Sequence, residues 1–359
     1  MSFKTYGLAL IGFGNVGRGL AQLIIDKEKQ LRLDPEISIK ITAVSDMHLG
    51  MATHPAGLNL EELLRLPNEK GALAKLQGGQ PEPDNEAAMS ADHVDIVAEL
   101  TFTNPKTGEP AISHCRFAKD HGKHAITTNK GPVALAGGRL RNDAKNYKLA
   151  FEYEGSVMSG TPVIRFAKDT LAGASISSFR GILNGTANYV LGRAEEGDTF
   201  EEAIKSAQEL GYAEADPTAD IGGSDVFAKV RILSGELFGY EREIASERVT
   251  GIDGLSEATV REAPKSGNRW KLIGEGKLDA AGKVHLIVEP MLLPSSDPLA
   301  GLSGALNGVS FTTDVLDDVT VVGPGAGRVE TAFALLSDIL DIHRNSLAPK
   351  YCPIPKEEG

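Results

Sequence analysis

Six residues near position 12 have the types and spacing needed to hold a phosphate. Residues Gly12–Gly17 read GFGNVG, a Gly-x-Gly-x-x-Gly pattern that follows an apolar run and opens a helical one. Gly12 permits the tight turn, Gly14 lets the main chain approach a pyrophosphate, and Gly17 allows the helix to pack closely on the strand. The helix N-terminus adds oriented N–H donors and the positive end of a dipole. Because the hexapeptide lies between a predicted strand and a predicted helix, it predicts a dinucleotide site. Without that context, a plain structural turn would explain it as well.

Asp46 follows the second apolar run and supplies the carboxylate that such a site uses for a ribose. It lies 29 residues after Gly17, beyond the usual spacing of about 20 residues, and the long first helix with the loop at 29–35 accounts for the difference. A carboxylate at this place binds both ribose hydroxyls and repels a 2′-phosphate, so the sequence favours NAD over NADP. Two alternatives stay open: Asp46 caps the following loop, or a lysine elsewhere binds a 2′-phosphate.

Charged residues in two later segments form a second candidate site. Lys130 follows a short apolar run, which places it at the carboxyl edge of a sheet, where open α/β sheets bind ligands. Asp225 and Lys229 are spaced i, i+4, so both project from one face of a predicted helix. The plain alternatives are a solvated surface lysine and a surface salt bridge, which is the commoner fate of such pairs.

The elements that must position these residues alternate over the first third of the chain. Apolar runs predict strands at 6–11, 38–44, 94–100 and 124–128, and helical patterns begin at Val16 and cover 60–66 and 112–119. Strands separated by helices of this length predict βαβ units and a parallel sheet. The polar stretch at 67–91, which carries prolines and glycines, is predicted as a surface loop.

From about Lys148 the pattern mixes strands and helices. Residues 151–156 predict a strand, and the capping box Thr199–Glu202 starts a helix that ends near Gly211. Residues 270–273 and 284–288 predict a hairpin, and the glycine cluster Gly323–Gly327 opens a last amphipathic helix. This mixture indicates an α+β domain.

Composition excludes several classes of function. The 359 residues predict about two domains, and 37 Lys+Arg against 49 Asp+Glu give a net charge of −12, which argues against a nucleic-acid or membrane-surface partner. Cys115 and Cys352 form no CxxC pair, so neither a disulfide framework nor a structural zinc site is predicted. The sequence has no signal peptide and no apolar run near 20 residues, so we expect a cytoplasmic protein.

Taken together, these segments resemble NAD(P)-dependent homoserine dehydrogenase along nearly the whole chain. The resemblance rests, in the family's order and spacing, on Gly12–Gly17, Thr101–Pro110 (TFTNPKTGEP), Thr128–Pro132 (TNKGP), Gly181–Tyr189 (GILNGTANY), Glu214–Lys229 and Gly323–Gly327. It implies the short, catalytic-only form, without the regulatory or aspartokinase domain of other members. The implied reaction interconverts L-homoserine and L-aspartate 4-semialdehyde, on the route to threonine, methionine and isoleucine.

The resemblance also implies roles for individual residues. Lys229 would be the general acid/base, with Lys130 and Asp225 as the other catalytic residues. The implied contacts to a small amino-acid substrate are Gly185, Thr186, Glu214, Asp220 and Asp225. The implied contacts to the dinucleotide are Gly12, Gly14, Asn15, Val16, Gly17, Asp46, Thr101, Thr103, Lys130 and Gly325.

Elementary electrostatics leaves the role of Lys229 open at this point. A free lysine has a pKa of about 10.4, too high for a base at neutral pH. Two lysines meeting at one oxygen would lower each other's pKa, whereas Asp225 would raise that of Lys229. The alternative is that both lysines stabilise a developing alkoxide while a water carries the proton.

A structural sodium ion is a further implication of the resemblance. Glu154 would be its side-chain ligand, with main-chain carbonyls of Val157, Ser159 and Thr161. The segment departs from the family's usual glycine run at Met158 and Ser159, which weakens this prediction.

These patterns predict an α/β protein: a doubly wound Rossmann-type parallel sheet with an inserted α+β substrate and dimerisation domain. Residues 1–150 with about 322–359 would form the dinucleotide-binding domain and about 151–321 the other, in a homodimer or higher homo-oligomer. Another Rossmann dehydrogenase is the nearest alternative, but it should lack the Glu214–Lys229 segment. A silent redox sensor is a second alternative, against which the presence of Lys130 and Lys229 counts.

Overall fold

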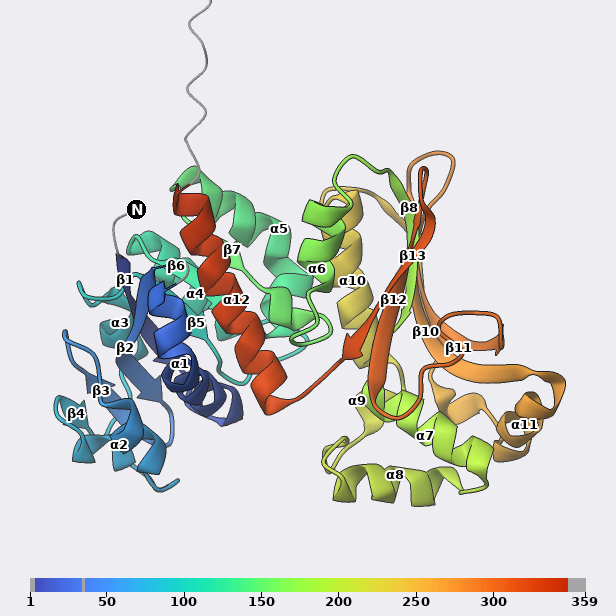
Figure 1. Ribbon diagram of the computed structural model, residues 1–359, viewed down its shortest axis with the longest axis horizontal. Coiled ribbons are helices and arrows are strands. Elements are labelled where there is room, and N and C mark those ends of the chain that lie inside the picture. Colours follow the sequence, from blue (N-terminus) through green and yellow to red (C-terminus); the bar gives the residue numbers. More distant parts are fainter. Residues whose placement is uncertain (1–3, 34–35, 348–359) are drawn as a thin grey trace, which may run out of the picture.

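The computed structural model describes residues 4–33 and 36–347, and they form two lobes, each built on its own sheet (Figure 1). The first lobe holds a seven-stranded sheet in the order β4-β3-β2-β1-β5-β6-β7. Its strands are β1 (Lys4–Ile11), β2 (Ile37–Asp46), β3 (Gly50–Thr53), β4 (Gly79–Gln80), β5 (Ile96–Glu99), β6 (His124–Thr127) and β7 (Phe151–Glu152). The strands from β2 to β7 in this order pair in parallel, and β3 and β4 add an antiparallel edge.

Helices cover both faces of this sheet, which confirms the doubly wound prediction. Side chains of β1 alternate between two cores: Leu8 and Leu10 pack with α1 (Asn15–Leu33), α2 (Leu60–Arg65) and α12 (Arg328–Leu347). Ala9 and Ile11 pack in the other core, with α3 (Asn85–Ser90), α4 (Ala111–Asp120) and α5 (Lys130–Asn146). A parallel strand covered on both faces is apolar throughout, as β1 is from Tyr6 onward.

The surface loop predicted at 67–91 is wrong. This stretch contains a 3₁₀ turn (Ala72–Lys75), strand β4 and helix α3. Asp84 caps α3 by accepting a hydrogen bond from the Ala87 N–H, and the helix buries Ala88 and Met89 against the sheet. Elements this short draw their stability from the tertiary core rather than from local sequence, so a local pattern does not reveal them.

The second lobe is a six-stranded sheet with helices on it, in the order β13-β12-β8-β10-β11-β9. Its strands are β8 (Ile176–Ile182), β9 (Ile244–Val249), β10 (Asn268–Leu278), β11 (Val284–Pro294), β12 (Leu306–Thr313) and β13 (Asp317–Pro324). Its helices are α7 (Gly185–Glu196), α8 (Phe200–Glu209), α9 (Thr218–Ile221), α10 (Ser224–Phe238) and α11 (Glu257–Glu262). The predicted hairpin is the antiparallel β10–β11 pair, and the predicted capping box starts α8, with Thr199 and Glu202 bonded to each other's backbone.

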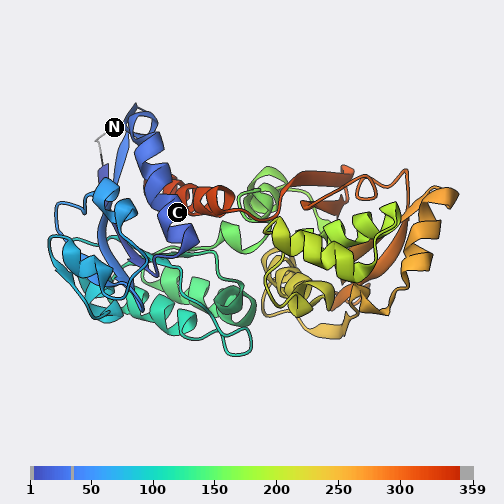
Figure 2. The ribbon, with the colours of Figure 1, turned by 90° about the horizontal axis from the view of Figure 1, so that it is seen from below.

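The chain crosses between the lobes twice, and Figure 2 shows both crossings near the middle of the molecule. The first crossing follows β7, which is only two residues long rather than the predicted 151–156, and leads through α6 (Val163–Arg165) and a π turn (Phe166–Thr170). The second follows β13, after which α12 returns to the first lobe and packs against α1, where Gly19 faces Arg328 and Ala332. Within the described residues, no helix is long and apolar enough to cross a membrane.

Candidate active site

The glycine-rich turn between β1 and α1 has the form that a dinucleotide requires. Gly12 has φ +96°, and a Cβ there would lie 2.7 Å from the Leu100 carbonyl oxygen. At Gly17 a Cβ would lie 3.1 Å from the Gly12 oxygen, so this glycine permits close packing within the turn. At Gly14, by contrast, a Cβ would meet no atom within 4 Å. The main chain at Gly14 is therefore open on the side from which a phosphate would approach.

Asp46 stands at the end of β2 beside this turn. Its Oδ2 accepts a hydrogen bond from the Phe13 N–H at 2.8 Å. Its Oδ1 accepts from the N–H groups of His48 and Leu49 at 2.9 and 3.0 Å. The carboxylate thus lies beside the fingerprint and caps the loop after β2, which is one of the two functions considered for it.

A single carboxylate joins the two lobes at the charged site. Asp225, in the first turn of α10, has Oδ1 2.8 Å from Lys130 Nζ and Oδ2 2.8 Å from Lys229 Nζ. Lys130 is the first residue of α5, in the first lobe, and Lys229 lies one turn beyond Asp225. The side chains of Asp225 and Lys229 are only 12% and 10% exposed, which rules out the surface salt bridge considered as the plain alternative.

Burial decides the electrostatics that the sequence left open. It is the largest cause of the lowered pKa of Lys229; the Lys130 ammonium lowers that pKa too, and Asp225 opposes both. For Asp225, burial alone would raise the pKa, but the Lys229 and Lys130 ammonium groups outweigh it and hold the carboxyl below its usual range. The charge of Asp225 raises the pKa of Lys130. The two lysines therefore have opposite tendencies: Lys130 stays protonated and Lys229 gives up its proton more readily.

Asn184 orients the acidic groups, and sequence reasoning missed it. Its side-chain oxygen accepts from the Ala187 N–H at 2.8 Å and caps α7. Its amide nitrogen donates to Asp220 Oδ1 at 2.7 Å and to Asp225 Oδ2 at 2.9 Å. Burial raises the pKa of Asp220, so that a proton is held there more strongly than on an exposed aspartate. The sequence signal that was available is an asparagine directly before a helix.

Glu99 is a second residue that sequence reasoning missed. It ends β5 with its side chain fully buried, and its carboxylate accepts hydrogen bonds from both the N–H and the hydroxyl of Thr101. Asn129, which directly precedes Lys130, donates its side-chain amide to the same carboxylate, and His114 Nδ1 lies 3.2 Å from it. This network fixes the turn from which Lys130 extends. A glutamate inside an apolar strand was the signal that could have found it.

The remaining predicted dinucleotide contacts lie in different settings. Thr101 uses its hydroxyl on Glu99, whereas the buried Thr103 hydroxyl has no hydrogen-bond partner among the described residues. An unpartnered buried hydroxyl next to Gly131 is suited to a bound molecule. Gly325 lies against Asn307, so closely that a Cβ there would clash with its side chain.

The remaining predicted substrate contacts surround the lysines less tightly. Thr186 is buried and donates to the Tyr212 carbonyl at 2.7 Å, which ties α7 to the acidic loop, and Gly185 packs on Ala305. Glu214 lies exposed in that loop. Its carboxylate makes no hydrogen bond or ion pair with the residues that the structure describes, although its charge contributes to the raised pKa of Lys130.

The side chain of Glu154 is turned toward the protein rather than toward a cation. Its two carboxylate oxygens accept from the N–H groups of Ile164 and Arg165 at 2.8 and 3.0 Å, and the Arg165 guanidinium lies 3.4 Å away. A guanidinium at this distance repels a cation, so the carboxylate does not fit the role of a sodium ligand. Main-chain carbonyls of Val157, Ser159 and Thr161 are left for that role. In 4–33 and 36–347 no group of three His, Cys, Asp or Glu is placed to hold a metal.

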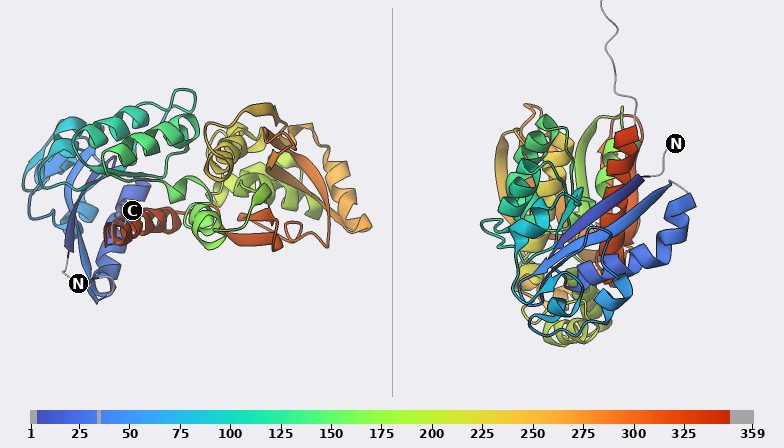
Figure 3. Two further views of the ribbon diagram at one scale, coloured as in Figure 1. Left: turned by 90° about the horizontal axis from the view of Figure 1, so that it is seen from above. Right: turned by 90° about the vertical axis from the view of Figure 1, so that its left-hand side faces the viewer.

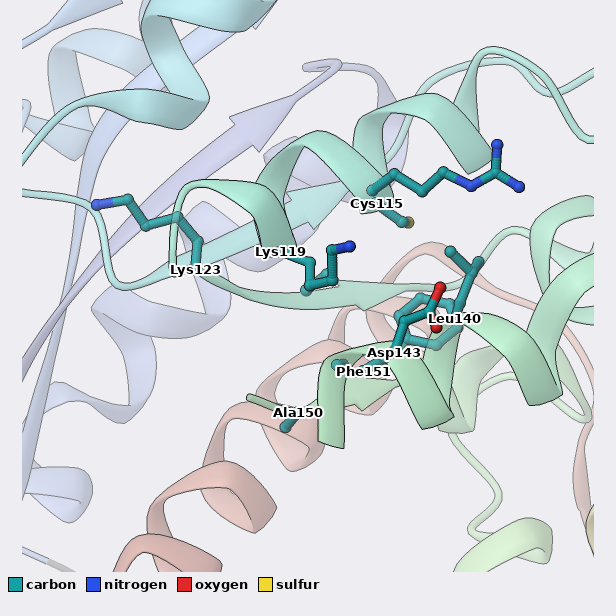
Figure 4. Close-up of a pocket in the computed structure, with 10 residues that line it drawn as sticks. Cys115, Lys119, Lys123, Leu140, Asp143, Ala150 and Phe151 are labelled. Carbon is teal, nitrogen blue, oxygen red and sulfur yellow. The ribbon is translucent and has the colours of Figure 1, made fainter. Parts of the chain in front are cut away.

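A small hollow between α4 and α5 lies away from these residues (Figure 4). It is lined by Cys115, Leu140 and Phe151 among others and measures about 10 Å³. That is room for about one water molecule. None of its lining residues belongs to the predicted site, and Lys123 points away from it to bond the Ala91 and Val94 carbonyls.

Known proteins with the same arrangement identify the family. A family model described as homoserine dehydrogenase matches residues 162–340. The NAD(+)-dependent homoserine dehydrogenase of Pseudomonas canavaninivorans is 52% identical over 341 residues, covering 95% of this chain and 97% of that relative. The chain belongs to the homoserine dehydrogenase family. It is therefore an NAD(P)-dependent oxidoreductase, as the sequence predicted.

Solved homoserine dehydrogenases share the fold over nearly the whole chain. The crystal structure of a putative homoserine dehydrogenase from Archaeoglobus fulgidus has a TM-score of 0.81 at 34% identity, covering 94% of this chain and 99% of that one. A hyperthermophilic archaeal homoserine dehydrogenase in complex with NADPH has a TM-score of 0.80 at 25% identity, covering 95% of this chain and 98% of that one. Both lobes of this homoserine dehydrogenase thus have counterparts in solved members of the family.

Proposed function

We propose that this homoserine dehydrogenase interconverts L-homoserine and L-aspartate 4-semialdehyde, with NAD as its preferred dinucleotide. The observation that carries the proposal is the Asp225 carboxylate, which holds Lys130 from the first lobe and Lys229 from the second at 2.8 Å each. The Asp225 and Lys229 side chains of this centre are nearly buried, the centre lies where the N-terminal ends of α5 and α10 meet, and it combines both signs of charge. A small zwitterion needs such a combination, and the helix ends favour its carboxylate.

The chain's residues fit a dinucleotide. Open main chain at Gly14, with the N–H groups of Asn15, Val16 and Gly17 at the start of α1, would hold the pyrophosphate, and Gly12 shapes the turn. Asp46 would bind the ribose, and Thr101, Thr103, Lys130 and Gly325 would complete the contacts. When bound, the dinucleotide supplies the hydride chemistry.

The preference for NAD rests on the charge of Asp46. A carboxylate beside the ribose position repels a 2′-phosphate. The name of the Pseudomonas relative specifies NAD(+), whereas the archaeal homoserine dehydrogenase is in complex with NADPH, so the relatives differ in the dinucleotide they are described with. Asp46 favours the first of these for this chain.

The acidic residues and α7 would bind the substrate. Asp220 and Asp225, held by the Asn184 amide, would bind the substrate ammonium group, with Glu214 from the adjoining loop. Thr186 and the main chain at Gly185 would line the same site at the start of α7. The substrate oxygen would then lie near both lysines.

The two lysines would divide the chemistry according to their surroundings. Lys229, whose pKa is lowered mainly by burial, would take the hydroxyl proton when homoserine is oxidised and return it in the reverse direction. Lys130, whose pKa Asp225 raises, would remain an ammonium group and stabilise negative charge on the substrate oxygen. A water that carries the proton between two purely electrostatic lysines is the alternative mechanism.

Four further features belong to the proposal. The first lobe with α12 would be the dinucleotide domain (1–150 and about 322–359, of which 348–359 lie outside the described residues), and about 151–321 the substrate and dimerisation domain. The enzyme would be cytoplasmic and would form a homodimer or a higher homo-oligomer. Strand β9, an edge strand whose six residues are all exposed, offers a surface for the second copy.

A sodium ion would be held by carbonyls near Ser159, whose φ of 53° bends the chain there.

Initial rates test the proposed function directly. Homoserine with NAD should give dinucleotide reduction, with a lower rate for NADP at equal concentration. Amino alcohols such as serine serve as the comparison substrates. If another amino alcohol were oxidised faster than homoserine, the alternative of a different Rossmann dehydrogenase would hold.

A further inference from the structure

A second ion pair links the same two helices that carry the charged site. Arg141 Nη1, on α5, lies 2.6 Å from Glu236 Oε2, on α10. Each of these residues stands 11 positions after its counterpart in the first pair, because Lys130 leads to Arg141 along α5 and Asp225 leads to Glu236 along α10. Eleven residues make about three helical turns and a rise of about 16 Å, so each helix presents both of its charged residues on one face. The two pairs therefore join α5 and α10 at two levels, with the helices running in the same direction (Figures 1 and 3).

The second pair is built into the protein rather than placed on its surface. The Glu236 side chain is fully buried, and Tyr153 donates its hydroxyl to Oε1 while Lys168 Nζ lies 3.0 Å from Oε2. Burial would raise the pKa of Glu236, but Lys168 and Arg141 outweigh it and keep the group ionised. Arg141 is the member of this cluster that comes from α5, whereas Lys168 comes from the turn Phe166–Thr170 in the crossing between the lobes.

Close packing at Tyr240 holds the helices together at the same level. Cβ atoms at Gly137 and Gly138 of α5 would lie 2.8 and 2.5 Å from Tyr240 atoms. A Cβ at Gly235 of α10 would lie 2.4 Å from the same side chain. The three glycines thus let one tyrosine touch the backbone of both helices, and the Arg141 guanidinium lies 5.5 Å from its ring centre. A substituent at any of these glycines would require the Tyr240 side chain to move.

We propose that the Arg141–Glu236 pair is a positioning device that fixes α5 against α10 and thereby holds Lys130 on Asp225, three turns away. The pair does not touch the reacting atoms. Lys130 reaches the site from the first lobe, and Asp225 and Lys229 reach it from the second, so the reaction depends on the relative position of the two helices. The Lys130 and Asp225 side chains are 42% and 12% exposed, whereas those of Arg141 and Glu236 are 33% and 0% exposed, so the second pair is the more shielded from solvent of the two links between the helices. This inference rests on the proposed function.

The test removes the link to α5 and leaves the buried carboxylate paired. Arg141→Met and Arg141→Gln break the link while Lys168 still neutralises Glu236, and Arg141→Lys retains the charge. Lys168→Met is the matched control on the same carboxylate. Arg180→Met is the matched control elsewhere, since Arg180 pairs with Asp297 at 2.6 Å with similar exposure but joins no residues of α5 and α10. Thermal unfolding would be used to check that each variant is folded.

Two readouts decide the outcome. In the neutral Arg141 variants we expect kcat for homoserine oxidation to fall on the order of 10- to 100-fold with little change in the KM for NAD. The acid limb of kcat/KM should move to higher pH, because Lys229 loses the nearby Lys130 charge. We also expect faster amide hydrogen exchange in the first turns of α5 and α10. Arg141→Lys should restore the wild-type pH profile and the wild-type exchange rates. The two control variants should resemble the wild type in pH profile and in exchange.

Either readout can overturn the proposal. Neutral Arg141 variants that match Lys168→Met and Arg180→Met in exchange or in pH profile would remove the positioning role. If Arg141→Met does not fold, Arg141→Gln, which keeps hydrogen-bond donors, answers the same question. A wild-type protein that does not oxidise homoserine would refute the proposed function instead, and hydrogen exchange alone would then decide whether the pair holds the helices together.

Discussion

Lys229 Nζ donates to the main-chain oxygen of Leu183 at 2.6 Å while its other close contact is Asp225, and this arrangement holds the amine in a fixed place. Leu183 precedes Asn184, the cap of α7, so the residue that orients the acidic groups also adjoins the carbonyl that orients the lysine. The position of the Lys229 nitrogen is thus set by the start of α7 as much as by its own helix. The predictions below begin from this geometry.

Replacing Lys229 should abolish turnover without loss of the dinucleotide site. Lys229→Met removes the proton carrier, and we expect kcat to fall by about 10² to 10⁴, the usual contribution of a general acid or base. The glycine turn is unaffected, so the Kd of NAD, measured by fluorescence titration, should stay within a factor of two or so of the wild type. Turnover like that of the wild type would show that Lys229 is not the acid/base and would favour the water-mediated alternative.

Asn184 should affect both substrate binding and stability. Asn184→Ala removes the cap of α7, which costs about 1 kcal/mol of unfolding free energy, and frees Asp220 and Asp225 from their shared donor. We expect a raised KM for homoserine in steady-state assays. Asn184→Asp is the comparison, because it keeps the cap but introduces a third carboxylate beside two others. If Asn184→Ala changed stability alone, the residue would be only a helix cap.

The charge of Asp46 should set the dinucleotide preference. Asp46→Asn keeps an acceptor oxygen for one of the two adjoining turns, either the Phe13 N–H or the N–H groups of His48 and Leu49, and removes the repulsion of a 2′-phosphate. The ratio of kcat/KM for NAD over NADP should therefore fall by about tenfold, which corresponds to about 1.4 kcal/mol. Equal losses with both dinucleotides would mean that Asp46 acts only as a cap.

Lys271 should make stability depend on pH above 8. It is 3% exposed in β10, bonded to Asn188 Oδ1 and the Leu302 carbonyl, and burial lowers its pKa to about 8. A lysine whose pKa is lower in the folded state binds fewer protons there than in the unfolded chain, so stability should rise between about pH 8 and pH 10.5. The full gain corresponds to about 3 kcal/mol.

Denaturant unfolding across this range checks the prediction. Lys271→Met should remove the rise, whereas Lys277→Met, an exposed lysine of the same strand, should retain it. If the wild type and Lys271→Met had the same slope of unfolding free energy against pH, Lys271 would not be the group responsible.

Local sequence patterns were sufficient to predict the elements whose residues follow a short-range rule. The glycine fingerprint, the i, i+4 spacing of Asp225 and Lys229, and the apolar run of β1 each follow from short-range geometry, and the structure contains all three. The strand β4 and helix α3 escaped prediction because their few residues are stabilised by contacts with the rest of the sheet. The direction of a side chain escaped it too: Glu154 turns to the N–H groups of α6, a choice that depends on residues ten positions away.

The residue types of the site could be predicted from the sequence, but their arrangement in space could not. Lys130 and Asp225 are 95 residues apart, and no pattern within either segment requires that they meet. Glu99 and Asn184 were overlooked because their importance lies in the several donors and acceptors gathered around them, and that gathering exists only in the folded chain. Only the family resemblance indicated that Lys130 and Asp225 belong to one site.

The return of α12 to pack on α1 has a mechanical consequence. The second lobe is inserted between two segments of the first, so two chain crossings connect the lobes. If a protease cuts one crossing, the other still connects them. A cut near Gly325 would even leave α12 buried in its own core, with Leu335 and Ile339 still in place.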